Sequence, residues 1–369
     1  MCRKGFVIVS VLLFMLFNHQ AIAACAFAPN EEFPANSLKK MTVPLAKNAI
    51  SVPPGTAVGS VIYSQKINIT SGADKLRVTC DITGAFQFIR DYKTLPLTET
   101  TPGSKIYKTG IAGIGIRFVN SANTKFPVTS PAIGCEVSKT CYITNNGLWA
   151  ASSWFDLVKT ADTVGAGTIV ASNLPTTLYS FGQSGSMVNI YEINLSGSVS
   201  INTPTCNITP VSQSMTVLMG SHHVSDFTGK GSGTEWKNAS IQLSDCGWFY
   251  GNSPAAAVAT FDGTSNTVKA LTNNAADITL TPLDGTITPA EGIMAIANNA
   301  SAATGIGIQL SSTQSDSGKI NLDSAYTHTL PNDGSRTITI PLFARYIQTE
   351  TSLSAGKAIG KLEYTISYH

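Results

Sequence analysis

One stretch of this sequence combines the side chains that carbohydrate recognition uses. A sugar site needs planar amide and carboxylate groups for vicinal hydroxyls, and an aromatic ring for the C–H face of the sugar. The residues of this kind are Tyr142, Asn145, Asn146, Trp149, Trp154 and Asp156. A structural interpretation is also open, in which the tryptophans are core aromatics and the asparagines form a turn. The stretch is therefore a candidate ligand site.

Three further residues are candidates for ligand contact. Arg90 and Tyr92 flank Asp91 in a polar run, which could equally be a solvated loop or a surface ion pair that contributes little stability. Arg117 belongs to a glycine-rich alternating segment, and this position favours an outward-facing strand residue over a ligand contact.

The inventory of catalytic residues argues against an enzyme. Apart from His19, the histidines lie in the second half of the chain, at His222, His223, His328 and His369. The first half therefore has no histidine base for a Ser or Cys triad, and the chain has no G-x-S-x-G, H-E-x-x-H or P-loop motif. A two-carboxylate glycosidase needs no histidine, but the acidic residues of the first half show no suggestive pairing. We expect no enzyme activity and no cofactor.

Charged residues are scarce in this chain. The 24 Lys+Arg and 22 Asp+Glu make up 12% of 369 residues, about half the share of an average soluble domain. Such a low density of positive charge does not suit a nucleic-acid-binding surface. Hydrophobic residues still account for 43%, enough for packed cores, and no run after residue 23 reaches the ~18 apolar residues of a transmembrane helix.

The N-terminus has the three parts of a signal peptide. Arg3 and Lys4 form the basic part, residues 6–17 the apolar part, and residues 21–23 the small-x-small cleavage site. The apolar part is too short to span a bilayer. We therefore predict cleavage after Ala23 and export of the chain.

Export changes what the cysteines are expected to do, because an oxidising compartment favours disulfides. Six cysteines remain after cleavage, and they allow fifteen pairings in principle. In a two-domain chain, Cys206 can pair only with Cys246, because these two are the cysteines of the second domain. Cys135 and Cys141 are spaced for a disulfide that closes a short loop. The sequence does not fix the pairing of the four cysteines in the first domain. The absence of C-x-x-C and of a Cys/His cluster makes a metal site unexpected. The expected bridges are Cys25–Cys80, Cys135–Cys141 and Cys206–Cys246.

Short alternating segments, separated by Gly, Pro, Asn or Ser, run through the whole chain and are typical of β-strands. Many short strands predict antiparallel sandwiches or barrels, and only stretches such as residues 154–160 and 289–298 could form helical turns. A strand that ends near residue 201 is followed by Pro204, which indicates a boundary. We predict an all-β chain with a signal peptide at 1–23 and two β-sandwich domains at 24–201 and 202–369.

The last segment of the sequence alternates strictly, with apolar or aromatic side chains at 362, 364, 366 and 368. Tyr368 is the penultimate residue and Gly356 is fourteenth from the end. With this spacing, the second half resembles the pilin domain of chaperone–usher fimbrial subunits and their terminal β-zipper motif. Further segments similar to that family occur in its order at residues 205–206, 243–246, 303–310, 343–346 and 355–356, and the resemblance covers roughly residues 202–369.

This resemblance implies an incomplete immunoglobulin-like sandwich that lacks its last strand. A missing strand would leave a hydrophobic groove and unpaired backbone groups beside the terminal strand, and a donated strand would fill it by β-augmentation. The implied partners are a periplasmic chaperone, the outer-membrane usher and the adjacent fimbrial subunit. The terminal carboxylate would be held by basic residues of the chaperone. The implied docking residues are Gly356, Leu362, Tyr364, Ile366, Tyr368 and His369.

The first half resembles, more loosely, the receptor-binding domain of type 3 fimbrial adhesins. The similar segments are residues 58–62, 78–81 and 111–118, together with Cys25 near the start of the mature chain. The resemblance implies a lectin-like sandwich. The pair Cys135 and Cys141 departs from the family pattern, and no binding residue is carried over because the loops do not align by motif.

Cleavage after Ala23 would leave only Ala24 before Cys25, so we expect no N-terminal strand for donation and a place at the distal tip, reached through the periplasm. The leading hypothesis is an extracellular tip adhesin that attaches a bacterium to host carbohydrate or matrix glycoprotein. The alternatives are a structural tip or capping subunit without a host ligand, and an exported glycosidase on a fimbrial anchor.

Overall fold

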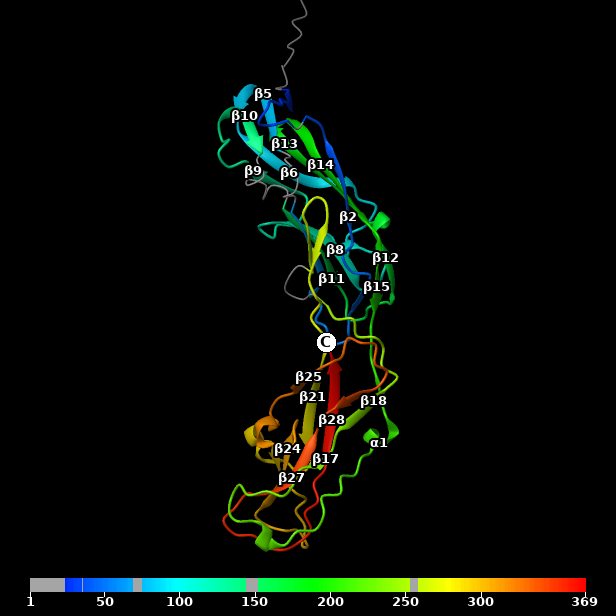
Figure 1. Ribbon diagram of the computed structural model, residues 1–369, viewed down its shortest axis with the longest axis vertical. Helices are drawn as coiled ribbons and strands as arrows, with labels where there is room; N and C mark the ends of the chain where they lie inside the picture. The colour runs from blue at the N-terminus through cyan, green and yellow to red at the C-terminus, as the bar shows by residue number, and fades with distance from the viewer. Residues whose placement is uncertain (1–23, 35, 69–74, 144–151, 253–257) are drawn as a thin grey trace, which may run out of the picture.

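The chain forms two β-rich domains that lie end to end along the long axis of the molecule (Figure 1). The computed structural model describes residues 24–34, 36–68, 75–143, 152–252 and 258–369, so the predicted signal peptide at 1–23 lies outside the described residues. Each domain has its own hydrophobic core, built mainly from residues 41–201 in the first and from residues 239–368 in the second. Within the described part, no helix is long and apolar enough to cross a membrane.

The first domain consists of short strands in four sheets. Its strands are β1 (Cys25–Phe27), β2 (Lys39–Pro44), β3 (Ala49–Ser51), β4 (Val61–Ile67), β5 (Leu76–Gly84), β6 (Phe86–Thr94), β7 (Tyr107–Lys108), β8 (Ile114–Asn120), β9 (Val128–Pro131), β10 (Ser138–Ile143), β11 (Ser153–Lys159), β12 (Gly167–Val170), β13 (Thr176–Gln183), β14 (Ser186–Ser196) and β15 (Ser198–Asn202), with a 3-10 turn at Ala171–Asn173. Two strands from later in the chain, β19 (Ala259–Phe261) and β20 (Asn266–Val268), join them. The sheet orders are β1-β5-β10, β20-β19-β4-β11-β8-β7, β12-β15-β3 and β2-β14-β13-β6-β9.

The strand β11 lies at the centre of the largest sheet, between β4 and β8. Its side chains alternate, with Phe155 and Leu157 buried in the first core and Trp154 and Asp156 on the opposite face. The expectation of a helical turn over residues 154–160 was therefore wrong. The period of two, with pairing on both edges, decides the conformation over this stretch.

The second domain is a smaller set of three sheets. It contains β16 (Asn207–Ile208), β17 (Lys237–Asn238), β18 (Ile241–Ser244), β21 (Ala275–Pro282), β22 (Thr286–Thr288), β23 (Ile293–Met294), β24 (Ile306–Ser311), β25 (Tyr326–Thr329), β26 (Ile338–Ile340), β27 (Phe343–Gln348), β28 (Leu362–Tyr368), helix α1 (Pro210–Gln213) and 3-10 turns at Val224–Asp226, Pro289–Glu291 and Asp316–Gly318. The sheet orders are β16-β18-β26, β17-β27-β24-β23-β22 and β25-β21-β28. In the stretch 289–298, one 3-10 turn precedes the short strand β23.

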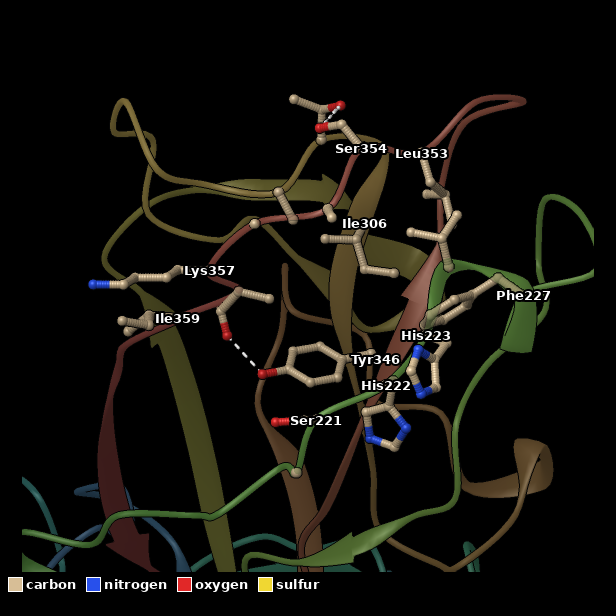
Figure 2. Close-up of a pocket in the computed structure, with 17 residues that line it drawn as sticks. Ser221, His222, His223, Phe227, Ile306, Tyr346, Leu353, Ser354, Lys357 and Ile359 are labelled. Carbon is tan, nitrogen blue, oxygen red and sulfur yellow. Dashed lines mark hydrogen bonds between the residues drawn. The ribbon is translucent and has the colours of Figure 1, made fainter.

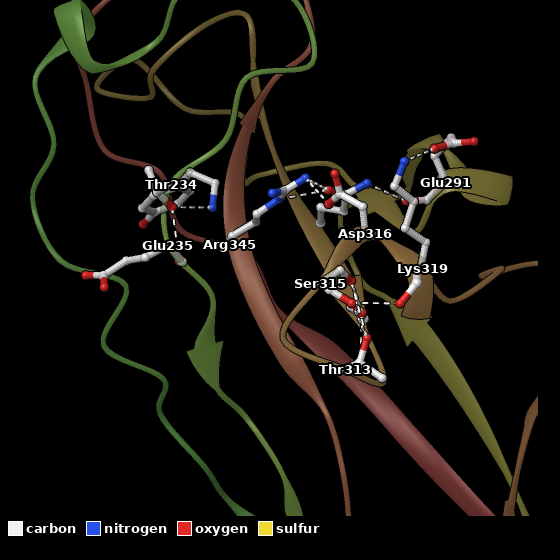
Figure 3. A network of polar contacts seen from close by, with 12 residues as sticks. Thr234, Glu235, Glu291, Thr313, Ser315, Asp316, Lys319 and Arg345 are labelled. Atoms are coloured by element: carbon white, nitrogen blue, oxygen red, sulfur yellow. Dashed lines mark hydrogen bonds and ion pairs between the residues drawn. The ribbon is translucent and has the colours of Figure 1, made fainter.

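A polar network joins the two central strands of the second domain, β24 and β27 (Figure 3). Arg345 donates from Nε (2.9 Å) and Nη2 (2.7 Å) to Oε1 of the fully buried Gln309, and Nη2 also lies 2.6 Å from Oδ1 of Asp316. The guanidinium lies 4.5 Å from the centre of the Trp236 ring. Because each buried polar group here has a partner, the network holds the sheet together without leaving unsatisfied donors.

Three disulfides reinforce the strand pairing, and they join the cysteines that the sequence analysis paired. Cys25–Cys80 connects β1 to β5, and Cys206–Cys246 lies at the ends of β16 and β18. Cys135–Cys141 closes the loop that leads into β10.

One hairpin crosses from the second half of the chain into the first domain. The strand β19 pairs in parallel with β4, and β20 pairs with β19. Val258 and Phe261 are only 2% and 3% exposed and belong to the first core. These residues lie beyond residue 202, where the sequence analysis placed the start of the second domain, so the first core is built from two separate parts of the chain.

The two domains also meet through backbone contacts near the end of β28, and the C-terminus lies at their junction (Figure 1). The amide of Ser51 donates to the carbonyl of Gly251 (3.1 Å), and the amide of Gly55 donates to the carbonyl of Tyr368 (2.9 Å). A Cβ on Gly55 would lie 2.6 Å from that carbonyl oxygen, so the approach requires glycine. The buried ammonium of Lys159 donates to two carbonyls of the loop that carries Gly55, and this fixes the loop.

Candidate functional site

The face of β4, β11 and β8 that points away from the first core carries two rows of side chains, set by the strand register. In one row, Trp154 lies between Lys66 and Val119; in the other, Asp156 lies between Ser64 and Arg117. Directly opposite residues of neighbouring strands project from the same face of a sheet. We call the six residues Ser64, Lys66, Arg117, Val119, Trp154 and Asp156 the outer face.

An ion pair occupies the second row of the outer face. Arg117 Nε lies 2.9 Å from Asp156 Oδ2, and the side chains are 19% and 7% exposed. A carboxylate this deep is costly without a partner, and its hydrogen bond to Arg117 supplies one. Asp156 and Arg117 therefore position each other, and their charges largely cancel toward a ligand.

The first row offers groups that a ligand could reach. The Lys66 ammonium lies 5.1 Å from the centre of the partly exposed Trp154 ring, within the range of a cation–π contact. The chemistry available here is an aromatic ring with a positive charge over one of its faces. Such a pair suits a ligand with a C–H surface and polar or anionic substituents.

The other residues of the predicted carbohydrate stretch do not all gather on this face. Tyr142 lies on β10, in the β1-β5-β10 sheet, where its ring centre is 4.6 Å from that of Phe33 and half of its surface is exposed. Asn145, Asn146 and Trp149 lie outside the described residues. Of the predicted stretch, the structure brings together Trp154 and Asp156.

Arg90 and Tyr92 lie inside the first domain, on strand β6. Arg90 is 4% exposed, its Nη1 donates to Ser130 Oγ (3.3 Å), and burial lowers its pKa. Tyr92 packs edge-to-face against Tyr107 with ring centres 5.4 Å apart, and burial raises its pKa. We leave both residues out of the outer face, because β6 belongs to a different sheet and the ring of Tyr92 is held within an aromatic cluster.

Ser64, Lys66 and Val119 belong to the outer face although the sequence analysis did not single them out. The alternation of the segment 61–67 indicates that a polar Lys66 points away from the core. The sequence contains no signal that places Lys66 opposite Trp154, because the register between β4 and β11 depends on long-range pairing.

A second candidate surface runs along the edge strand β28. This strand pairs with β21 on one side, and within the described residues no strand pairs with its other edge. The Tyr364 hydroxyl donates to the carbonyl of Ser212 (2.6 Å), just before the unpaired segment 214–219. Partly exposed apolar side chains of both segments pack on the second core, namely Met215, Val217, Met219, Leu362, Tyr364 and Ile366.

A pocket of about 590 Å³ lies where the segment 214–219 ends and just before β28 begins (Figure 2). The Tyr346 hydroxyl reaches across its wall to the carbonyl of Ala358 (2.7 Å), and burial raises the pKa of this tyrosine. Gly356 also lines the pocket, and a Cβ there would lie 2.4 Å from the Ala303 amide nitrogen. Other lining residues are His222, Phe227, Ile306, Leu353 and Ile359.

The last two residues of the predicted docking set lie at the domain junction. Tyr368 is 9% exposed and stacks on Phe249 with ring centres 5.7 Å apart. His369 Nε2 lies 3.2 Å from Asp277 Oδ1. In the part of the chain that the structure describes, no group of three or more His, Cys, Asp or Glu side chains could hold a metal ion.

The chain matches two protein families. The family described as MrkD-like receptor binding domain matches residues 43–198, and the family described as fimbrial protein matches residues 193–369. A protein of Klebsiella pneumoniae named "Fimbria adhesin protein" is 25% identical over 328 residues, which cover 88% of this chain and 90% of that protein.

Two solved structures match the chain with low TM-scores. The receptor binding domain of the Klebsiella pneumoniae adhesin MrkD1P is 22% identical, with a TM-score of 0.34 over 51% of this chain and 99% of that one. The CupB6 tip adhesin of Pseudomonas aeruginosa is 16% identical, with a TM-score of 0.36 over 94% of each chain.

Proposed function

We propose a function from one premise: this chain belongs to the fimbrial adhesins, with an MrkD-like receptor binding domain followed by a fimbrial protein domain. These are families of binding and structural proteins, so the chain is a pilus-associated extracellular protein and not an enzyme. Our proposal is that it acts at the fimbrial tip and attaches the bacterium to a host glycan or glycoprotein. We retain 24–201 and 202–369 as the proposed domains, with the hairpin of residues 258–268 docked on the first domain.

The partly exposed pair of the outer face, Trp154 and Lys66, is our proposed receptor site, because Ser64, Val119 and Asp156 are buried. Its support is the pairing of a partly exposed indole, Trp154, with the ammonium of Lys66. Aromatic rings are suited to the C–H surface of a sugar, and the ammonium held over one face of this ring orients polar substituents. The ion pair of Arg117 and Asp156 in the neighbouring row holds the adjacent strands β8 and β11 in register.

A glycan array and immobilised matrix glycoproteins, probed with the full chain, test the receptor site. Trp154→Ala and Lys66→Gln should each weaken binding at least tenfold, whereas Lys108→Gln, an exposed lysine near the other edge of the same sheet, should not. Melting temperatures separate a lost contact from lost folding. If the full chain binds none of these ligands while intact fimbriae adhere, the subunit is a structural tip or cap.

We further propose that the second domain accepts a strand along β28. The support is the edge of β28 with which no strand pairs within the described residues, beside the segment 214–219, whose apolar side chains are only partly covered. Exposed strand edges and apolar grooves are sites for β-augmentation. A periplasmic chaperone would supply that strand first and the adjacent fimbrial subunit later, with the outer-membrane usher guiding the exchange.

Matched substitutions on β28 test strand acceptance. Ile366 packs on the second core, whereas its neighbour Thr365 points to solvent. Ile366→Asp should therefore abolish recovery of the chain with a co-expressed fimbrial chaperone, and Thr365→Asp should leave recovery unchanged. Equal recovery of the two variants would contradict the proposal.

A further inference from the structure

The outer face of the first domain is extended by residues from the second half of the chain. Strands β19 and β20 continue the sheet beyond β4, so that β4 is not an edge strand. The register places Ala259 opposite Gln65, Thr260 opposite Lys66 and Phe261 opposite Ile67. The hairpin is thus a structural part of the domain that carries the proposed receptor site.

Backbone hydrogen bonds and buried apolar side chains hold this hairpin in place. The amide of Val258 donates to the carbonyl of Ser64 (2.7 Å), and the amide of Asn68 donates to the carbonyl of Phe261 (2.8 Å). Val258 and Phe261 are buried in the first core. Burial of two large apolar side chains makes this attachment more than an edge contact.

Hydrogen bonds between side-chain amides also hold the hairpin on the first domain. Gln65 Nε2 donates to Asn266 Oδ1 (3.0 Å), and Asn266 Nδ2 donates to the carbonyl of Pro44 (2.9 Å). Gln65 is fully buried, and its amide also donates to Pro44. An unpaired amide at this depth would be costly, so Asn266 satisfies a polar group that the first half leaves partly open.

The same register adds two hydroxyls to the row that holds Trp154. Thr260 lies opposite Lys66, and Thr267 lies opposite Thr260 on the next strand. Since directly opposite residues share a face, the row reads Val119, Trp154, Lys66, Thr260 and Thr267. From Trp154 to Thr267 it crosses three strand spacings, about 14 Å. Thr260 is partly exposed and Thr267 is exposed.

We propose that the receptor site is composite: the hairpin of residues 258–268 completes it and supplies Thr260 and Thr267 as ligand contacts. This inference rests on the proposed function and deepens it. A row of indole, ammonium and two hydroxyls over this length fits an extended, hydroxyl-rich chain such as an oligosaccharide better than a single sugar ring. Binding then depends on the two halves of the chain together.

Isosteric substitutions in the full chain test the composite site. Thr260→Val and Thr267→Val keep the shape and β-branching but remove a hydroxyl. Each should weaken binding to the oligosaccharides captured on the array about three- to tenfold, the effect of one lost hydrogen bond, without a change in melting temperature. Thr281→Val, an exposed threonine on β21, is the matched control. Unchanged affinity in both hairpin variants overturns the composite site.

Hydrogen exchange tests hairpin docking without any ligand. The Asn68 amide, which donates to Phe261, should exchange slowly in the full chain and quickly in Phe261→Ala. Fast exchange in the unaltered chain overturns the composite site and leaves the proposed function standing. Slow exchange in a full chain that binds no ligand overturns the proposed function, and the composite receptor site with it.

Discussion

Phe261 offers a sharp test of how the two halves are combined. It lies in the second half of the sequence, but its side chain is 3% exposed in the core of the first domain. Phe261→Ala removes a fully buried ring and leaves a cavity, which typically costs about 3–5 kcal/mol. At about 2–4 °C per kcal/mol for a domain of this size, the first domain should melt about 6–20 °C lower. The second domain should keep its transition.

Urea unfolding, followed by hydrogen exchange of separate strands, measures this effect. Amides of β11 report on the first domain and amides of β21 on the second. Leu330→Ala is the matched control, because Leu330 is fully buried in the second core and should lower only the β21 transition. If Phe261→Ala lowers the free energy of unfolding by less than about 1 kcal/mol, or lowers it only for the amides of β21, Phe261 does not belong to the core of the first domain.

Three other perturbations follow from contacts already described. Asp156→Asn leaves Arg117 without its carboxylate partner. The free energy of unfolding measured in urea should therefore fall by about 2–4 kcal/mol, and the double variant Asp156→Leu, Arg117→Met should regain most of this loss. Replacing Cys135 and Cys141 with serine should cost about 2 kcal/mol, since the bridge closes a short loop; an unchanged melting temperature would contradict this. Burial lowers the pKa of His328 below its ordinary 6.5, so its contribution to stability is complete above pH 6.5 and shrinks as the pH falls toward the lower folded-state pKa. His328→Gln should therefore flatten the decline of the urea midpoint between pH 7 and pH 5, and an unaltered slope would show that another group is responsible.

The all-β class and the alternation of β28 could be predicted from sequence, because a strand with one covered face has a period of two. The same rule places Trp154 and Asp156 on one face, once the stretch is recognised as a strand. Sequence motifs also led to the family, since the terminal strand and the cysteine spacing are local features.

Other features depend on partners far away in the sequence. Strand β6 lies between β13 and β9, and the ring of Tyr92 packs against Tyr107; a polar local sequence reveals neither. Likewise, the contact between Lys66 and Trp154 and the docking of β19 on β4 are set by register between distant segments. A strand of three residues, such as β19, carries too little pattern to indicate the sheet to which it belongs.

The hairpin of residues 258–268 lies within the sequence of the second domain but docks on the first, and this changes how a mechanical load would pass through the molecule. Within the described residues, the chain passes from the first domain to the second after β15 and again between β20 and β21. A pull between the two domains would therefore load the chain after β15 and between β20 and β21, together with the pairing of β19 with β4 and the contact between Gly55 and Tyr368. We expect single-molecule pulling to show no free swivelling of the first domain at low force. Extension should begin only when β19 is sheared from β4.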